Sequence, residues 1–167
     1  MVRIVGIDPG LATVGFGVLD TDGRSHRVVN FGVVTTPAGM PFARRLSVIY
    51  EDVQALMARY EPQAVALEEL FFYHNVTTAI DVAQARGVAL IAAAHAVSDE
   101  QLFEYTPMQI KLAVCGYGHA DKIQVQQMVK TLLGLSKVPQ PDDAADALAV
   151  AICHANSRLM GHEFTIR

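Results

Sequence analysis

The sequence has no tryptophan, two cysteines and no long uninterrupted apolar run, and these shortages narrow the class of protein. Cys115 and Cys153 lie far apart and form no metal-binding pattern, which favours a reducing, cytoplasmic setting. The longest apolar candidate, residues 87–97, is shorter than the roughly 18 to 20 residues of a membrane span and contains His95. We therefore expect a soluble protein, and the strand-like sequence directly after Met1 does not resemble a signal peptide.

Charged residues are also scarce, at 18% of the chain, whereas apolar residues make up 51%. This balance excludes a disordered chain, and 167 residues are enough for one domain with a sizeable core. The net charge is −4, from 13 basic and 17 acidic residues. Because phosphate binding requires positive charge, the acidic balance taken alone argues against a nucleic-acid partner.

The hydrophobic pattern predicts one α/β domain over residues 1–167. Alternation and turn residues predict strands at residues 2–8, 13–19 and 28–35, and short apolar runs predict two more at 64–67 and 102–105. Helical spacing, capping residues and proline predict helices over residues 42–60, 75–96, 121–133 and 142–158, with a short one from Pro107. The order is βββαβαβ followed by helices, which indicates a mixed central sheet flanked by helices. The crossover between the first and fourth strands indicates that they are parallel neighbours.

Four acidic residues are candidates for a common site. Asp8 ends the first strand and Glu68 ends the fourth, so the expected parallel pairing brings both to the same edge of the sheet. Asp143 and Asp146 are three residues apart on the last helix and share a face. The sequence therefore allows acids from two strand ends and one helix to converge.

Each acid also has a structural interpretation. Asp8, before Pro9-Gly10, suits an Asx turn, and Glu68-Glu69 suits a solvated strand end. Asp143 suits the dipole at a helix N-terminus. Asp146 is harder to explain in this way, because its helix is otherwise almost entirely apolar and a buried acid needs a cation or a hydrogen-bond donor.

A cluster of unpaired carboxylates has a clear chemical use. Such groups repel one another unless a hard cation neutralises them, and oxygen-only ligands select Mg²⁺ or Mn²⁺ over zinc. Two such ions, about 3.5–4 Å apart, activate water and stabilise the leaving oxygen in phosphodiester hydrolysis. Two divalent ions would also offset the net charge of −4, so the acidic balance does not exclude DNA.

Several blocks occur in a fixed order along the chain. They are Gly6-Ile7-Asp8-Pro9-Gly10, Val65-Ala66-Leu67-Glu68 with Phe71 three residues on, Gln84-Ala85-Arg86-Gly87-Val88-Ala89, Lys111 followed by Gly116-Tyr117-Gly118 and Asp121-Lys122, and Asp143-Ala144-Ala145-Asp146-Ala147-Leu148-Ala149. In this order the blocks resemble the RuvC family of bacterial Holliday junction resolvases, and the resemblance runs from residue 4 to about residue 154. A lone Gly-Ile-Asp-Pro-Gly would be a weak signal, but five blocks in register are a specific one.

The resemblance implies an RNase H-like fold, a homodimer, and paired symmetric nicking of two like strands of a four-way DNA junction. It implies Mg²⁺ or Mn²⁺ as cofactor, two ions per site, and the RuvA and RuvB branch-migration proteins as partners. The family's catalytic, metal-binding acids fall on four positions: Asp8, Glu68, Asp143 and Asp146. Its DNA contacts fall on Phe71, Lys111 and Lys122.

The sequence departs from the family pattern at a few positions near these contacts. Cys115 replaces a usual threonine, Leu112 stands where a second lysine is common, and Glu69 stands where some relatives carry glutamine. Taken in isolation, without the flanking blocks, Lys111 and Lys122 are better interpreted as ordinary surface charges. The three successive aromatics of residues 71–73 favour a platform on which bases stack, because a core position explains one or two of them but not a third in a loop.

Two other classes of protein remain as alternatives. A nucleotide-binding domain of the actin or sugar-kinase type also opens with an acidic, glycine-rich hairpin, but such proteins need two domains of this kind. A non-catalytic RNase H-like factor in RNA processing would have no need of all four acids.

Overall fold

The computed structural model describes residues 1–70, 76–160 and 164–166, and these residues form a five-stranded mixed sheet. The strands are β1 (Val2–Asp8), β2 (Thr13–Thr21), β3 (His26–Thr35), β4 (Ala64–Glu68) and β5 (Leu102–Tyr105). Their order in the sheet is β3-β2-β1-β4-β5. β2 pairs antiparallel with β1 and β3, whereas β4 pairs parallel with β1 and β5. The predicted meander and the predicted parallel neighbours are therefore both confirmed.

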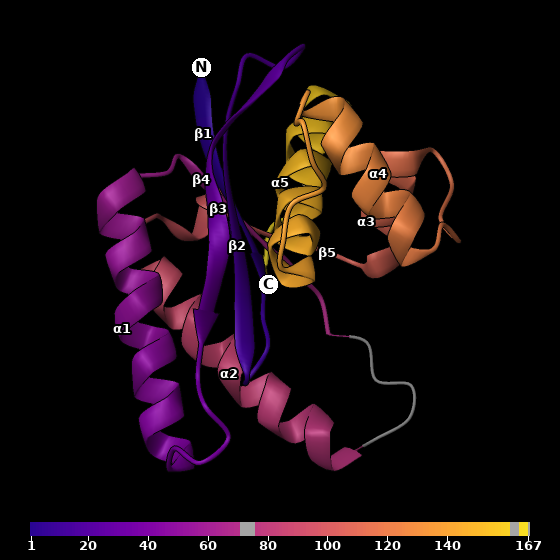
Figure 1. Ribbon diagram of the computed structural model, residues 1–167. Helices are drawn as coiled ribbons and strands as arrows, with labels where there is room; N and C mark the ends of the chain where they lie inside the picture. Colours follow the sequence, from indigo (N-terminus) through magenta and orange to yellow (C-terminus); the bar gives the residue numbers. More distant parts are fainter. Residues whose placement is uncertain (71–75, 161–163, 167) are drawn as a thin grey trace.

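Helices cover both faces of this sheet (Figure 1). They are α1 (Phe42–Tyr60), α2 (Val76–Ala94), α3 (Pro107–Cys115), α4 (Lys122–Leu132) and α5 (Asp142–Met160), with a 3-10 turn η1 (Asp99–Gln101). α1 and α2 lie on one face, and α5 lies on the other with α3 and α4 packed against it. Two apolar cores result, one on each side of the sheet. The predicted α/β order of elements is confirmed.

Glycines in the first two strands allow α5 to lie directly against the sheet. A Cβ atom on Gly6 would overlap the Ala147 carbonyl oxygen, and one on Gly15 would overlap the Asp143 carbonyl oxygen. The helix backbone therefore approaches β1 and β2 more closely than any side chain would permit. This close approach fixes the position of the α5 N-terminus relative to the carboxyl end of β1.

The β2–β3 hairpin is longer than the sequence pattern predicts. Its extra residues are polar, and one of them, Asp20, is buried because it receives a double hydrogen bond from Arg3, at 2.8 Å and 3.0 Å, and a third from Arg27. The end of β2 lacks the apolar alternation that predicts a strand, because its buried side chain is the paired carboxylate of Asp20. The predicted helix over residues 75–96 ends at Ala94, and the 3-10 turn that follows was not predicted.

Candidate active site

Asp8 and Glu68 lie side by side at the ends of neighbouring parallel strands. Ile7 is in register with Leu67, so the next residue of each strand is an acid. Both carboxyl groups leave the sheet at the edge where the parallel strands end, as the sequence predicted. The chain turns at Pro9-Gly10, where β1 ends before its return as β2.

The first turns of α5 bring two further acids to this edge. Asp143 lies in the first turn and its backbone packs against Gly15 of β2. Asp146, one turn on, faces the pocket that also contains Glu68. Its side chain is 26% exposed, and the Lys122 ammonium lies 3.2 Å from its Oδ2 atom. The prediction that Asp146 needs a cation or a donor is therefore confirmed.

The electrostatic environment of Asp8 is that of a crowded carboxylate cluster. Burial, and then the charges of Glu68 and Asp146, raise the pKa of Asp8 well above its ordinary value, with a smaller contribution from Asp143. A hydrogen bond between the Asp8 and Glu68 carboxyls raises the pKa of Asp8 and lowers that of Glu68. Of the two carboxyl groups, Asp8 is therefore the one whose pKa is raised the more strongly.

Burial and the charge of Asp146 also raise the pKa of Glu68, although Lys111 and Lys122 act in the opposite direction. Burial raises the pKa of Asp146, against the lowering effect of Lys122. All three acids are thus disfavoured as anions where they stand. Groups in this condition gain most from a cation that neutralises them, and the donors they offer are all oxygens, as Mg²⁺ and Mn²⁺ prefer.

Two lysines line the same pocket as Glu68 and Asp146. This hollow has a volume of about 280 Å³, and its walls come from β4, α3, α4 and α5. Lys111 lies in α3, which begins at the Thr106 cap and Pro107, whereas Lys122 opens α4 directly after the Asp121 cap. The pocket therefore combines acids that suit a metal with cations that suit phosphate.

Lys122 also contacts Asp142, an acid outside the predicted set of four. Asp142 Oδ2 lies 3.4 Å from the Lys122 ammonium, so this lysine bridges two acids of α5. Burial lowers the pKa of Lys122, but Asp146 and Asp142 outweigh that effect and raise it. The signal available in the sequence was the pair of adjacent acids at 142 and 143, which a helix N-terminus explained equally well.

The structure brings most of the predicted site residues together. Asp8, Glu68 and Asp146 interact directly or through their charges, and Lys111 and Lys122 face two of them. Asp143 contributes charge at Asp8 but does not line the pocket. In the described part of the chain, no three His, Cys, Asp or Glu side chains already surround one point at ligand spacing. The Lys122 ammonium supplies the positive charge at Asp146 in this arrangement.

The remaining predicted contact, Phe71, lies outside the described residues. Two family departures are visible beside the pocket: Leu112 is exposed on α3, and Cys115 is partly buried at its end. Glu69 does not line the pocket, and its backbone N–H donates to the Tyr105 carbonyl oxygen at 2.9 Å.

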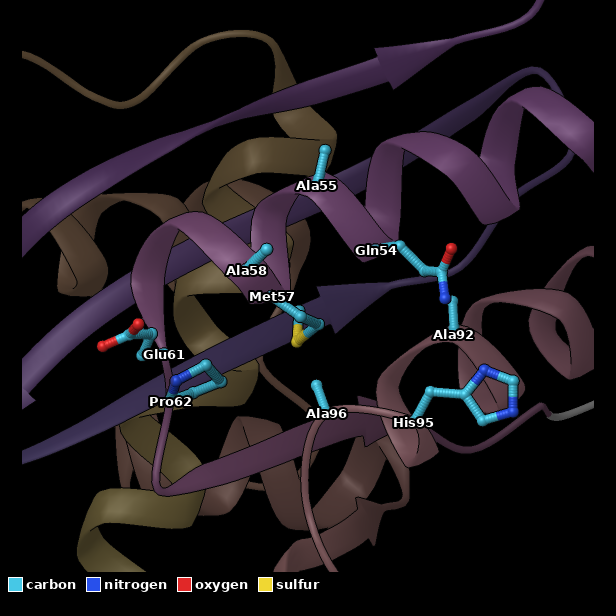
Figure 2. Close-up of a pocket in the computed structure, with 9 residues that line it drawn as sticks. All are labelled: Gln54, Ala55, Met57, Ala58, Glu61, Pro62, Ala92, His95 and Ala96. Atoms are coloured by element: carbon cyan, nitrogen blue, oxygen red, sulfur yellow. The ribbon is translucent and has the colours of Figure 1, made fainter.

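A larger hollow lies between the C-terminal ends of α1 and α2, close to the segment that leads into β4 (Figure 2). Its volume is about 710 Å³, but Glu61 is the sole acid among its lining residues and alanines form much of its wall. The larger hollow is not the candidate active site, because the acidic and basic side chains converge on the smaller pocket beside Glu68 and Asp146. Among the described residues, no helix is long and apolar enough to cross a membrane.

Comparison with known proteins identifies the fold and the family. The structure of Thermus thermophilus RuvC in complex with a Holliday junction substrate superposes with a TM-score of 0.92, at 38% identity, covering 99% of this chain and 100% of that chain. The fold and the site thus define a nuclease of the RNase H-like α/β class, as predicted.

Sequence relatives make the assignment more specific. The family model of crossover junction endodeoxyribonuclease RuvC matches residues 4–154. The relative of that name from Alkaliphilus oremlandii is 52% identical over 164 residues, 98% of this chain and 99% of its own. That from Rubrobacter xylanophilus is 57% identical over 157 residues, 94% of this chain and 87% of its own. The chain belongs to the RuvC family.

Proposed function

We propose that this chain resolves four-way (Holliday) DNA junctions by metal-dependent hydrolysis of phosphodiester bonds in two like strands. The observation that carries the function is family membership across nearly the whole chain, with relatives named crossover junction endodeoxyribonuclease. A nucleotide-binding domain and a non-catalytic RNA-processing factor are both disfavoured by this degree of identity. The same membership supports one nuclease domain over residues 1–167, action in recombination and repair in the cytoplasm, and partnership with RuvA and RuvB.

The metal site of this proposal consists of Asp8, Glu68, Asp143 and Asp146, holding two Mg²⁺ or Mn²⁺ ions. Metal dependence is general in this family. Its support here is the donor chemistry, because the cluster offers carboxylate oxygens whose anionic forms are disfavoured without a cation. When bound, such ions activate water and stabilise the leaving oxygen. The chain's own lysines, Lys111 and Lys122, attract the phosphate to the pocket.

Cleavage of a labelled synthetic junction in EDTA, Mg²⁺ or Mn²⁺ tests this function. We expect cleavage with either divalent ion and none in EDTA. Cleavage that persists in EDTA after exhaustive removal of metal would contradict the proposed chemistry. A nucleotide-binding assay on the same preparation separates the kinase-like alternative, which predicts ATP binding and no cleavage.

Removing either pocket lysine should weaken the electrostatic part of junction binding. A lysine that contacts a phosphate releases a counterion on binding. In a plot of the logarithm of the binding constant against the logarithm of the salt concentration, Lys111→Ala or Lys122→Ala should therefore make the negative slope shallower by about 0.9. The control is Arg59→Ala, because Arg59 is an exposed cation in the last turn of α1, far from the pocket in the fold. Binding measured between low and moderate salt gives the slopes. Slopes and cleavage equal to those of the unmodified protein would make these two residues ordinary surface lysines.

We further propose a homodimer formed partly through α2. One face of this helix buries small residues on its own sheet, at positions 85, 89, 92 and 93. The opposite face exposes Ile80 and Ile91, at 54% and 48%, with Gly87 exposed between them at helical spacing. Apolar side chains flanking a glycine suit the close approach of a second helix, and symmetric cutting of two strands requires two sites related by a two-fold axis.

Sedimentation should therefore show a dimer at micromolar concentration. Ile91→Asp is expected to shift the population toward monomer, because it introduces a charge into the proposed interface. Leu132→Asp, at an exposed apolar position of α4, is the matched control and should leave the dimer intact. A protein that stays monomeric, with junction DNA present as well as without it, would refute the dimer.

A further inference from the structure

Arg86 lies near the middle of α2 and connects that helix to two strands. Its Nη2 atom donates to Glu104 Oε2 of β5 at 2.6 Å, and its Nε atom donates to the backbone carbonyl of Glu68 at 3.3 Å. The Arg86 side chain is 16% exposed and that of Glu104 is 30% exposed. This is a partly buried, charge-assisted contact, of a kind that holds its geometry better than a fully exposed ion pair.

Arg86 contacts Glu68 from the face of the sheet opposite the active-site pocket. Phe103 and Tyr105, the neighbours of Glu104 in β5, both place their rings against His154 of α5. Since side chains alternate along a strand, Glu104 projects to the other face of the sheet, where α2 lies. Arg86 therefore touches the backbone of Glu68 and lies on the face opposite the pocket that holds the Glu68 carboxylate.

The end of β4 is held at two points. Its ladder with β5 ends at the Glu68–Tyr105 pair, after which the Glu69 N–H donates to the Tyr105 carbonyl at 2.9 Å. Arg86 adds a restraint from α2 on the carbonyl of Glu68 itself. The position of the Glu68 carboxylate depends on this backbone, because Glu68 is the last residue of its strand and the ladder with β5 ends at the next N–H.

We propose that Arg86, itself oriented by Glu104, is a positioning residue that holds Glu68 for metal binding, an inference that depends on the proposed role of Glu68 as a metal ligand. A planar guanidinium can donate to the carboxylate and to the carbonyl at once, whereas a lysine ammonium is a single point donor on a flexible stem. Glu104 neutralises the charge of Arg86, which leaves the guanidinium to act through geometry. Groups that orient a metal ligand in this way commonly change metal affinity about 10- to 100-fold when removed.

The test is a calorimetric titration of the metal-free, DNA-free protein with Mn²⁺. We expect Arg86→Met, which keeps an unbranched apolar stem but has no donors, to weaken Mn²⁺ binding about tenfold. Arg86→Lys keeps the ion pair and should give a smaller loss. The control is Arg44→Met, because Arg44 forms an exposed pair with Glu51, at 3.3 Å with side chains 58% and 57% exposed, and its variant should bind as the parent does.

Cleavage gives a second readout. The Mn²⁺ concentration for half-maximal cleavage by Arg86→Met should rise by the same factor, and the rate should recover at saturating Mn²⁺, whereas metal-free junction affinity should stay within about twofold. Mn²⁺ affinity equal to that of the parent protein would overturn the proposal. A loss of metal-free junction affinity as large as the loss of Mn²⁺ affinity would also overturn it, since Arg86 would then be a DNA contact.

Two further variants keep the outcome interpretable. Should Arg86→Met fail to fold, Arg86→Lys and Glu104→Gln decide by the same criterion: weaker Mn²⁺ binding supports the proposal and unchanged binding overturns it. Glu68→Gln in the same titration tests the underlying assignment. If Glu68→Gln binds Mn²⁺ as the parent does, the proposed metal site fails; if it alone weakens binding, only the role of Arg86 fails.

Discussion

Asp8→Asn should lower the single-turnover rate of junction cleavage by about a thousandfold, because a catalytic metal supplies several kcal/mol of transition-state stabilisation. Asp8 is an acid whose pKa the other three carboxylates all raise, and in the proposed metal site its substitution removes a central anionic ligand. The amide is nearly the same size as the carboxyl, and burial beside the other acids already disfavours the charged form of Asp8. The fold should therefore tolerate the change, and the site should become less repulsive to phosphate.

Junction binding by Asp8→Asn should consequently equal or exceed that of the parent protein. The measurement is a binding titration without divalent ions, followed by single-turnover cleavage with Mg²⁺ or Mn²⁺ on the same preparation. Asp52→Asn, at an exposed acid of α1, is the control and should change neither quantity. Loss of binding in proportion to the loss of cleavage would show that Asp8 supports the DNA-binding surface and not the chemistry.

Glu68→Gln and Glu69→Gln should differ by orders of magnitude in cleavage rate, although the two acids are adjacent. Side chains alternate along a strand, so both cannot point to one centre unless the chain has already turned. The Glu68 carboxyl lines the pocket and shares a hydrogen bond with Asp8, whereas Glu69 does not line the pocket. Glu68→Gln keeps size and hydrogen-bonding capacity but removes the charge that holds a cation, so cleavage should fall about a thousandfold.

Glu69→Gln should cleave at a rate close to that of the parent. The backbone N–H of residue 69 donates to the Tyr105 carbonyl oxygen of β5, and a change of side chain leaves this hydrogen bond in place. Both variants are compared in single-turnover cleavage of one junction under identical metal concentrations. An inactive Glu69→Gln beside an active Glu68→Gln would mean that the register of the acids on this strand is wrong by one residue, and the assignment of Phe71 would be wrong with it.

The positions of the two site residues on strands, Asp8 and Glu68, were predictable from the sequence because two simple rules apply to them. The pattern of β1 and β4 fixes where each strand ends, and a helical crossover makes the two strands parallel neighbours, which brings Asp8 beside Glu68. Pro107 in the first turn of α3 and the capping residue Asp121 before α4 likewise marked the starts of these helices correctly.

The rest of the site depends on packing between distant elements, which local patterns do not report. The contact of Lys122 with Asp146 spans 24 positions, counted as 146 minus 122, and crosses a loop. Gly15 makes room for the backbone of α5, and this role is visible only once α5 lies against β2. Gly15 and Gly17 lie on the same face of their strand, a pattern that is compatible with a closely packed neighbour. Arg86 is part of a recognisable block, but its two partners are set by how α2 lies across β4 and β5.

The most direct test of the account is to map the cuts made in a four-way junction whose strands are each labelled in turn. A linear duplex of the same sequence is incubated in parallel with Mg²⁺ or Mn²⁺. We predict one nick in each of two like strands, at symmetric positions, and no comparable cutting of the duplex. Equal cutting of duplex and junction, or no cutting of either with both metals, would contradict the conclusion that this chain is a junction resolvase.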